Sequence, residues 1–418
     1  MTYKNKDCSG ILLVFLAAAI LIFSYCSKVA AAATIVLGDE RTDEYLPLLD
    51  GKRIALFTNH SAIVKGEHLL ELLLRNGQRV TVLYTPEHGI RGDKAAGETI
   101  ENGTDSVTGI PIVSLYNGAS GTVKPSIETM DKFDTLVIDI QDVGLRYYTY
   151  YITVCDLLEV CSVHGKEVIL LDRPNPNGHY VDGPILDMKF KCHIGRLPIP
   201  VVHGLTLGEL MNMAIGEGWL NLPQGLDFTV IPCLNYTHRT PYTLPVPPSP
   251  NLPNMKAVYL YPSLCPFEAT VVSVGRGTDL PFQCFGHPNL KKKYRYRFCP
   301  QSVKAAPNPP LLGQICYGVN LSRKKESDLR KKHMDLSHIV EAYKVFHRQG
   351  LGDSFFLKGR IGNLGEVEYF DLFMGKSYVR EAILAGKSAR EIRSMWRHDV
   401  ETFIEKSKPY LLYERKDE

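Results

Sequence analysis

The segment Thr135–Asp172 reads TLVIDIQDVGLRYYTYYITVCDLLEVCSVHGKEVILLD, and it contains two short apolar runs on either side of a longer one. The short runs, Thr135–Asp139 and Glu167–Asp172, are almost continuously apolar, which is typical of strands covered on both faces of a sheet. The longer run, Tyr151–His164, has the length of a helix. A strand, a helix and a second strand in this order predict a parallel pair with a helical crossover.

The same alternation occurs on both sides of this segment. Arg53–Thr58 and Arg79–Tyr84 have the length and apolar content of strands, and His68–Asn76 between them has those of a helix. An amphipathic helix is predicted at Leu207–Gly216, directly after a threonine that can cap its N-terminus. We therefore predict an α/β fold in which residues 40–241 form a Rossmann-like domain with a wound parallel sheet.

The composition changes at Tyr242–Pro253, YTLPVPPSPNLP. Proline fixes φ and has no N–H to donate, so this segment excludes a regular helix or an interior strand, and we take residues 242–253 as a linker. Beyond the linker the pattern predicts two helices and two strands, Ser337–Gln349, Ser388–Lys406, Val271–Val274 and Ile315–Leu321. Residues 254–418 are therefore expected to form a second, smaller α/β domain.

The N-terminal residues 1–33 have the layout of a secretory signal peptide. Lys4 and Lys6 precede the apolar run Ile11–Tyr25, and the small residues Ala30–Ala33 follow it. The apolar run is about 15 residues long, shorter than the roughly 20 that a membrane-spanning helix needs. We expect cleavage, export to the periplasm or the medium, and no stable membrane insertion afterwards. A retained N-terminal anchor or a lipoprotein is the less favoured alternative.

Charge and cysteine content exclude some classes of protein. The net charge of +3 is spread over 418 residues, which gives no basic footprint for nucleic acid. Two of the ten cysteines, Cys8 and Cys26, lie in the predicted signal peptide, and the other eight could form disulfides after export. The chain contains no CxxC pair and no HExxH motif, so we predict no metal and no other cofactor.

Polar residues follow four of the predicted strands. The carboxyl ends of strands in an open parallel sheet are where ligands bind, so these residues predict a pocket. They are Asn59 and His60; Glu87 and His88; Asp139, Gln141 and Asp142; and Asp172, Arg173 and Asn175.

The first chemical motif is Thr85–Asp93, TPEHGIRGD. A carboxyl group that is partly removed from water can hold a transferable proton near neutral pH, so Glu87 is a candidate general acid or base. His88 is a second candidate general acid or base, or a residue that orients Glu87. Gly89 and Gly92 would allow a ligand to approach the backbone. The structural alternative is a tight turn whose glutamate caps the next helix.

Three further motifs carry polar side chains. IDIQDVGLRYYTYY, Ile138–Tyr151, combines two carboxylates, an arginine and four tyrosines, a mixture that suits sugars unless the tyrosines simply begin a buried helix. DRPNPNG, Asp172–Gly178, is predicted to be a rigid loop. Its Asp–Arg pair has two alternative roles: it binds a ligand, or it only stabilises the loop. In Gly275–Asp279, GRGTD, Arg276 stands between glycines and suits an anion, without the GxGxxG or P-loop pattern of a nucleotide site.

Taken together, these motifs resemble the NamZ-type exo-β-N-acetylmuramidase family, glycoside hydrolases of peptidoglycan recycling that were long a domain of unknown function. The resemblance covers about Arg53 to Tyr413. The matching motifs, in order, are TNHSA at Thr58–Ala62, PEHGIRGD at Pro86–Asp93, AGE at Ala96–Glu98, IDIQDVGLRYYTY at Ile138–Tyr150, DRPNPNG at Asp172–Gly178, VHGLTLGEL at Val202–Leu210, PPSPNLP at Pro247–Pro253, YPSLCPFEAT at Tyr261–Thr270, SVGRGTD at Ser273–Asp279 and PYLLYE near the end.

The resemblance implies release of terminal N-acetylmuramic acid from the non-reducing end of peptidoglycan fragments, in a cleft that the smaller domain completes. The family's proposed catalytic glutamate falls on Glu87, and further glutamate positions fall on Glu98 and Glu268. The chain departs from the family after Glu268, where Ala269-Thr270-Val271 replaces Gly-Thr-Asn. This change places the substrate range on that side of the cleft in question.

The expected mechanism has Glu87 protonate the leaving oxygen, while a second group stabilises or attacks the anomeric centre. Asp142, Glu98, Glu268 and the substrate's own acetamido oxygen are the open alternatives, and Glu87, Glu98 and Asp142 are the predicted catalytic residues. The predicted substrate-binding residues are Asn59, His60, His88, Arg91, Gln141, Arg146, Tyr148, Asp172, Arg173, Asn175, His203, Glu268 and Arg276.

Within that set, Arg276 or Arg146 is expected to pair with the lactyl carboxylate of muramic acid. The expected partners are peptidoglycan-derived muropeptides or disaccharides, and the oligomeric state is open. Two rival functions remain at this level. One is a secreted muropeptide- or glycan-binding protein without turnover, and the other is a metal-dependent hydrolase that uses His60, His88 and Asp142.

Overall fold

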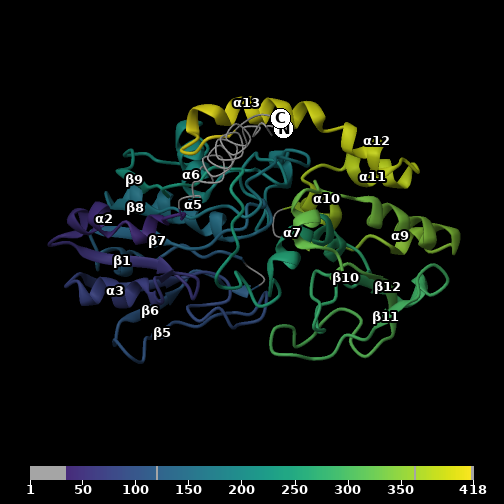
Figure 1. The fold of residues 1–418 in the computed structure, drawn as a ribbon, viewed down its shortest axis with the longest axis horizontal. Helices are drawn as coiled ribbons and strands as arrows, with labels where there is room; N and C mark the ends of the chain where they lie inside the picture. The colour runs from purple at the N-terminus through teal and green to yellow at the C-terminus, as the bar shows by residue number, and fades with distance from the viewer. Residues whose placement is uncertain (1–33, 119–120, 362–363, 416–418) are drawn as a thin grey trace, which may run out of the picture.

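The structure, a computed structural model, describes residues 34–118, 121–361 and 364–415 (Figure 1). The predicted signal peptide, 1–33, lies outside the described residues. A large sheet with its helices, purple to teal in Figure 1, stands beside a smaller region in green and yellow.

The large sheet has seven strands in the order β5-β6-β4-β1-β7-β8-β9. All neighbouring pairs are parallel except the antiparallel edge pair of β5 and β6. This arrangement confirms the predicted wound parallel sheet. The strands are β1 (Arg53–Thr58), β4 (Arg79–Thr85), β5 (Gly103–Thr104), β6 (Pro111–Ser114), β7 (Thr135–Asp139), β8 (Glu167–Leu171) and β9 (Phe228–Ile231).

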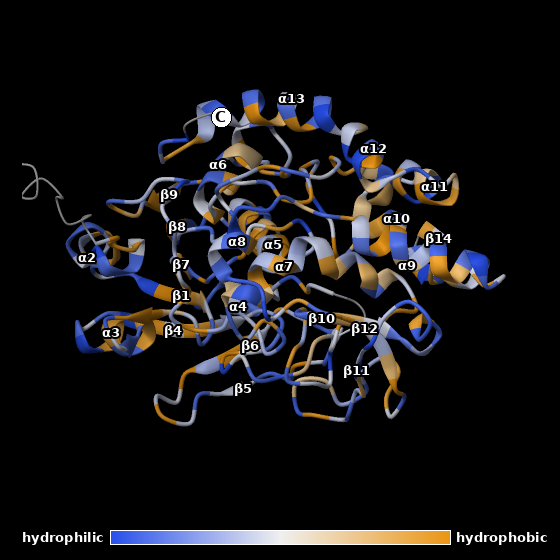
Figure 2. Ribbon diagram, turned by 45° about the vertical axis from the view of Figure 1, so that its right-hand side comes forward, coloured by the Kyte–Doolittle hydropathy of each residue, from blue (hydrophilic) through white to orange (hydrophobic). Residues whose placement is uncertain are grey.

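Helices cover both faces of this sheet because successive strand residues point to opposite sides. In β1, Ile54 and Leu56 pack in one cluster with α2 (Thr42–Leu49) and α3 (Leu69–Arg75). Ala55 and Phe57 of the same strand pack in the other cluster, with α5 (Tyr150–Val163) and α6 (Leu207–Gly216). In Figure 2, β1 and β4 are accordingly coloured mostly as hydrophobic.

Helix α6 begins as predicted, at the capping residue Thr206. Its hydroxyl accepts a hydrogen bond from the Glu209 N–H at 3.3 Å, and the Glu209 carboxylate accepts one from the Thr206 N–H at 2.9 Å. This reciprocal capping box satisfies two N–H groups that the helix itself leaves unpaired.

The second part of the chain follows a segment, residues 242–254, without helix or strand. It contains a three-stranded antiparallel sheet, β10-β12-β11, a β13–β14 pair, and helices on their flanks. The elements are α7 (Met255–Leu264), η4 (Cys265–Ala269), β10 (Cys284–His287), β11 (Tyr296–Phe298), β12 (Cys316–Asn320), α8 (Glu326–Arg330), α9 (Ser337–Arg348), β13 (Lys358–Ile361), β14 (Gly365–Glu368), α10 (Tyr369–Met374), α11 (Tyr378–Leu384), α12 (Ala389–Ser394) and α13 (Arg397–Ser407).

Two predictions for this region are wrong. Val271–Val274 forms no strand, because the hydroxyls of Thr270 and Ser273 accept hydrogen bonds from the backbone two residues on, at 3.1 and 3.2 Å, and turn the chain. Ser388–Lys406 is not one helix but two, α12 and α13. The break comes at Trp396, which is buried and donates its indole N–H to Asp182 at 2.8 Å.

After α13 the chain returns to the first domain, crossing the top of Figure 1 in yellow. The Tyr413 hydroxyl donates to Asp172 at 2.7 Å and accepts from the Cys233 N–H at 2.8 Å. Glu209 accepts from the N–H of Leu412 and of Tyr413. The last described residues therefore pack against the large sheet rather than the second domain. None of the helices in the described ranges has both the length and the apolar character needed to cross a membrane.

Candidate active site

A cavity of about 180 Å³ lies between the two domains. The loop after β4 and the segment before α5 line it from the first domain, and η4 with the following turn lines it from the second. Its carboxyl, imidazole and guanidinium groups are Glu87, His88, His193, Glu268 and Arg276. A larger groove of about 1070 Å³ runs between Asp182, residues 331–337 and helices α12 and α13, but it contains none of the predicted site residues.

Glu87 is partly exposed and has one hydrogen-bond partner on each carboxylate oxygen. The Gly97 N–H donates to Oε1 at 3.0 Å, and Oε2 lies 3.0 Å from the hydroxyl of Thr149, the residue before α5. The next α-helix in the described chain is α4 (Ile127–Met130), so Glu87 does not cap a helix that directly follows it. The capping alternative for this motif is therefore wrong.

His88 is buried in the wall of the cavity and has an unusual backbone. Its φ is 74°, in the left-handed region, and Gly89 follows at 72°. Its Nδ1 lies 2.8 Å from the Lys94 carbonyl oxygen. Because a carbonyl oxygen only accepts, Nδ1 carries the proton and Nε2 is left as an acceptor. Burial lowers the pKa of His88 below its usual value, against the opposing influence of Glu87.

On the opposite wall, Glu268 and Arg276 form a paired group. Arg276 Nε lies 2.5 Å from Glu268 Oε1, and Nη2 lies 3.3 Å from Oε2. The guanidinium also lies 4.9 Å from the centre of the Phe282 ring. The Cys265 sulfur stands 3.6 Å from Glu268 Oε2. All eight cysteines in the described residues are free thiols.

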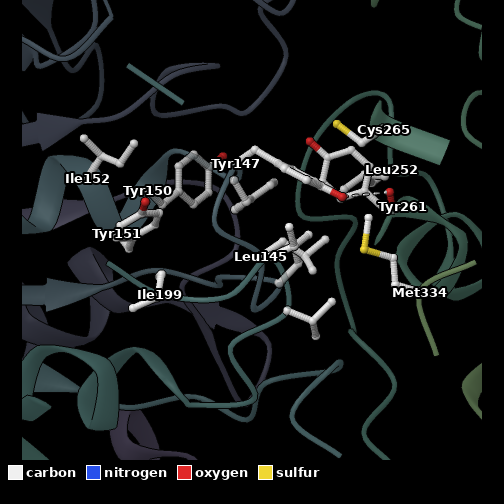
Figure 3. Close-up of a cluster of buried hydrophobic side chains, with 14 of the residues drawn as sticks. Leu145, Tyr147, Tyr150, Tyr151, Ile152, Ile199, Leu252, Tyr261, Cys265 and Met334 are labelled. Carbon is white, nitrogen blue, oxygen red and sulfur yellow. Dashed lines mark hydrogen bonds between the residues drawn. The ribbon is translucent and has the colours of Figure 1, made fainter. Parts of the chain in front are cut away.

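Tyrosines form the remaining aromatic wall. Tyr147 and Tyr261 meet edge to face with ring centres 5.5 Å apart, and Figure 3 shows these two side chains together. The hydroxyls of Tyr148 and Tyr150 donate to the Pro248 carbonyl at 2.9 and 3.3 Å. The rings of Tyr147, Tyr148 and Tyr150 are buried at or just before the start of α5, as the structural alternative expected, and they also line the cavity. Apolar rings held by backbone acceptors suit the faces of a sugar.

Two of the three predicted catalytic residues lie outside the lining of this cavity. Asp142 is buried, accepts a hydrogen bond from the Gly144 N–H at 2.7 Å, and has its pKa raised to about 7 by burial. Glu98 lies at the surface, where it accepts from the Ala95 N–H at 2.9 Å and pairs with Lys94 at 3.3 Å. Glu87 is the predicted catalytic residue that the cavity contains.

The predicted substrate-binding residues divide in the same way. Tyr148, His88, Glu268 and Arg276 line the cavity, and the others have partners elsewhere in the chain. The charged residues among them are paired: Arg146 donates to the carbonyls of Pro184, Ile199 and Phe373, Arg173 pairs with Asp39 and Asp139, Asp172 accepts from Thr206, Gly208 and Tyr413, and Arg91 pairs with Asp105 at 3.6 Å. The amides bind within the first domain: Asn59 binds Ser61 and Tyr150, Gln141 donates to Pro174, and Asn175 donates to Leu205. Of the histidines, His60 donates to Pro247 and His203 accepts from Leu205.

Several cavity residues were not among the predicted site residues, and three of them are polar neighbours from separate segments: Thr149, Tyr116 and His193. Thr149 lies within the tyrosine-rich motif. Tyr116 follows β6, and burial and the nearby Glu87 carboxylate raise the pKa of its hydroxyl. His193 lies late in the long connection between β8 and α6, after the short helix η3 (Met188–Phe190), so it is not next to a strand end and its position along the chain carries no signal. Among the described residues, no group of three histidine, cysteine or acidic side chains is placed to hold a metal ion.

Comparisons with known proteins agree on one relationship. Family models described as exo-β-N-acetylmuramidase NamZ, N-terminal and C-terminal, match residues 54–256 and 259–413. The chain is 32% identical over 395 residues to the peptidoglycan β-N-acetylmuramidase NamZ of Bacillus subtilis (strain 168), with 90% of each chain covered.

Two crystal structures of DUF1343 family proteins from Bacteroides fragilis NCTC 9343 have the same architecture. The first has a TM-score of 0.82 at 50% identity and covers 92% of this chain and 100% of its own. The second has a TM-score of 0.75 at 26% identity and covers 91% and 99%.

Proposed function

Because this chain belongs to the family of NamZ exo-β-N-acetylmuramidases, we propose that it releases terminal N-acetylmuramic acid from the non-reducing end of peptidoglycan fragments, with Glu87 as general acid/base. The enzyme is a glycoside hydrolase that acts on peptidoglycan. Muropeptides or disaccharides are the proposed substrates, and no cofactor takes part in the proposed reaction.

The observation that carries this proposal is the position of Glu87. It follows β4 directly, reaches the cavity between the domains, and remains partly exposed there. A cavity of about 180 Å³ is below the roughly 300–1,000 Å³ of most ligand sites, which favours one terminal sugar over a continuous run of glycan.

The partners of Glu87 suit a group that both gives and takes a proton. The Gly97 N–H can only donate, so it holds Oε1 as an acceptor. The Thr149 hydroxyl beside Oε2 can donate or accept, so it can bind either protonation state of the carboxyl group. Oε2 is therefore the oxygen from which we expect the proton to pass to the leaving glycosidic oxygen.

Arg276 is the proposed partner of the lactyl carboxylate. Glu268 engages Nε and Nη2, and Nη1 makes no hydrogen bond to another described residue. Arg146 is the weaker candidate, because it does not line the cavity and its Nη1 and Nη2 already donate to backbone carbonyls. The proposed pose places the carboxylate against the second domain and the scissile bond against Glu87.

Export remains part of the proposal because residues 1–33 have the layout of a signal peptide. Mass spectrometry of the mature N-terminus tests it. A protein that retains residue 1 would contradict cleavage.

The first prediction concerns Glu87→Gln. This variant keeps the shape of the side chain and cannot transfer the proton, so we expect turnover of a chromogenic N-acetylmuraminide to fall roughly 10²–10⁴-fold. Binding of free N-acetylmuramic acid, measured by calorimetry, should remain. Glu101→Gln, at an exposed position outside the cavity, is the matched control. Equal turnover in Glu87→Gln and the parent would remove Glu87 from the mechanism.

A further inference from the structure

We propose that His88 is the second acid–base residue of this reaction, and that its Nε2 takes a proton from the water that attacks the anomeric carbon. The inference rests on the proposed function and adds to it a named base and an inverting outcome. It differs from the four alternatives that the sequence left open for the second group.

The other carboxylates do not offer a free oxygen to the cavity. Asp142 is buried outside the lining, and Glu98 is at the surface, bound to Ala95 and Lys94. Glu268 lines the cavity, but both of its oxygens are engaged by Arg276. A base that activates water is best served by an acceptor that no cation already pairs with, and the two histidines of the lining carry such an acceptor.

His88 presents such a lone pair in a defined direction. Its Nδ1–H donates to the Lys94 carbonyl at 2.8 Å, which fixes the tautomer and leaves Nε2 without a hydrogen-bond partner in the described residues. A base oriented through its second ring nitrogen is the arrangement used where imidazole accepts protons. His193, the other histidine, makes no hydrogen bond to the described residues that would orient its ring.

The backbone at His88 supports a functional reason for its position. A φ of 74° is unfavourable for a residue with a side chain, and such conformations persist where the surroundings impose them, often at active sites. Here the conformation places Glu87 and His88, neighbours in sequence, together in the lining of one cavity. The unfavourable backbone conformation therefore occurs at the residue whose side chain has to lie beside Glu87 for the proposed reaction.

The electrostatic surroundings favour the neutral ring. Burial, the largest effect, and Arg276 lower the pKa of His88, whereas Glu87 and Glu98 raise it; His60 is the other titratable neighbour. The net direction is downward, so at neutral pH the ring is uncharged and able to accept a proton.

The step balances as a single displacement. The water oxygen forms a bond to the anomeric carbon while one of its protons moves to His88 Nε2. The glycosidic bond breaks, its electron pair stays on the leaving oxygen, and that oxygen takes the proton of Glu87. The product sugar is inverted, and exchange with solvent returns a proton to Glu87 and removes one from His88.

The test uses His88→Asn with the full-length mature enzyme. Asparagine tolerates left-handed φ better than most residues, so this variant keeps the backbone while removing the base. We expect turnover to fall at least roughly 10²-fold, with the acid limb of the parent's pH profile lost. Azide, which needs no base, should restore turnover and yield the α-glycosyl azide. His398→Asn, at an exposed position, is the control.

A second measurement does not depend on how the variant folds. Proton NMR during the first minutes of parent turnover should show α-N-acetylmuramic acid as the first product from the β-glycoside. Three results would overturn this inference but not the proposed function. They are a β-configured first product, turnover of His88→Asn near that of the parent, and a folded His88→Asn that azide does not rescue. A parent without any turnover would overturn the proposed function and this inference with it. Azide rescue of His193→Asn in place of His88→Asn would assign the base to His193.

Discussion

Arg146 and Arg276 show that the neighbours of an arginine determine whether it stabilises the fold or can bind a ligand. Arg146 donates to three backbone carbonyls between segments of the chain, and burial lowers its pKa to about 10. Arg276 faces the cavity and shares its charge with Glu268. A guanidinium has five N–H donors, so a binding role depends on how many of them the fold leaves available.

Substituting Arg276 by lysine tests the proposed contact with the lactyl carboxylate. Lysine keeps a positive charge beside Glu268 but lacks the planar fork that binds a second carboxylate with two hydrogen bonds. We expect the inhibition constant of free N-acetylmuramic acid to rise roughly tenfold, equivalent to about 1.4 kcal/mol. That of N-acetylglucosamine, which lacks the lactyl group, should hardly change. An equal rise for both sugars would show that Arg276 shapes the wall rather than binding the carboxylate.

Among the elements, the loops after parallel strands divide between binding and packing. The loop after β4 carries Glu87 and His88 into the cavity. The first residues of the loops after β7 and β8 instead stabilise the carboxyl ends of the strands. The Gly144 N–H donates a hydrogen bond to Asp142, and Arg173 forms an ion pair with Asp139. All of these loops lie at the carboxyl ends of the parallel strands, but their residues divide. Glu87 and His88 after β4 and Tyr147–Thr149 before α5 line the cavity, whereas Asp142 and Arg173 do not.

The loop after β7 predicts a pH dependence of stability. Burial raises the pKa of Asp142 from 3.8 to about 7, so the folded state holds a proton that the unfolded state loses near pH 4. Below about pH 4 the group is protonated in both states and does not change the free energy of unfolding. Between about pH 4 and 7 that free energy falls as the pH rises, and above about pH 7 the loss stays constant.

Asp142→Asn removes this charge and keeps an acceptor for the Gly144 N–H. We expect the variant to match the parent at pH 4 and to exceed it by roughly 1–4 kcal/mol at pH 8, in urea unfolding at both values. A loss of stability at both pH values would show that the carboxylate has favourable partners that outweigh its burial.

At the scale of the whole molecule, the C-terminal segment ties the end of the chain to the first domain. The hydroxyl of Tyr413 binds Asp172, just after β8, and the N–H of Cys233, just after β9. The two halves of the cavity wall are therefore joined by the proline-rich segment and again by the returning chain. This double connection is expected to make the domains unfold together.

Tyr413→Phe tests that connection. The change leaves a buried N–H and a buried carboxylate with one partner fewer, so we expect a loss of roughly 1–3 kcal/mol of unfolding free energy. Tyr410→Phe, which removes one bond to the more exposed Glu217, should cost less. Thermal unfolding of both variants provides the comparison. A separate early transition in Tyr413→Phe alone would show that the domains are less coupled than the contacts indicate.

Much of the sheet could be predicted because its central strands are short, apolar and covered on both faces. Thr135–Asp139 and Arg53–Thr58 coincide with β7 and β1. Strand β9 at one edge of the sheet and β6, next to the other edge, are only partly buried, and such strands carry a weaker apolar pattern. The predicted strand at Val271–Val274 failed because hydroxyl side chains supply local hydrogen bonds that compete with a ladder.

The sequence by itself determined the class of fold, the position of the proline-rich segment without helix or strand, and the placement of Glu87 and His88 just after β4. Those features depend on local composition and on the alternation of strands and helices. Only the tertiary structure decided which polar residues reach the cavity. A side chain at the edge of a sheet can point into a cleft or into a buried network, and contacts from distant segments such as Tyr413, Pro248 and Lys94 determine which it does.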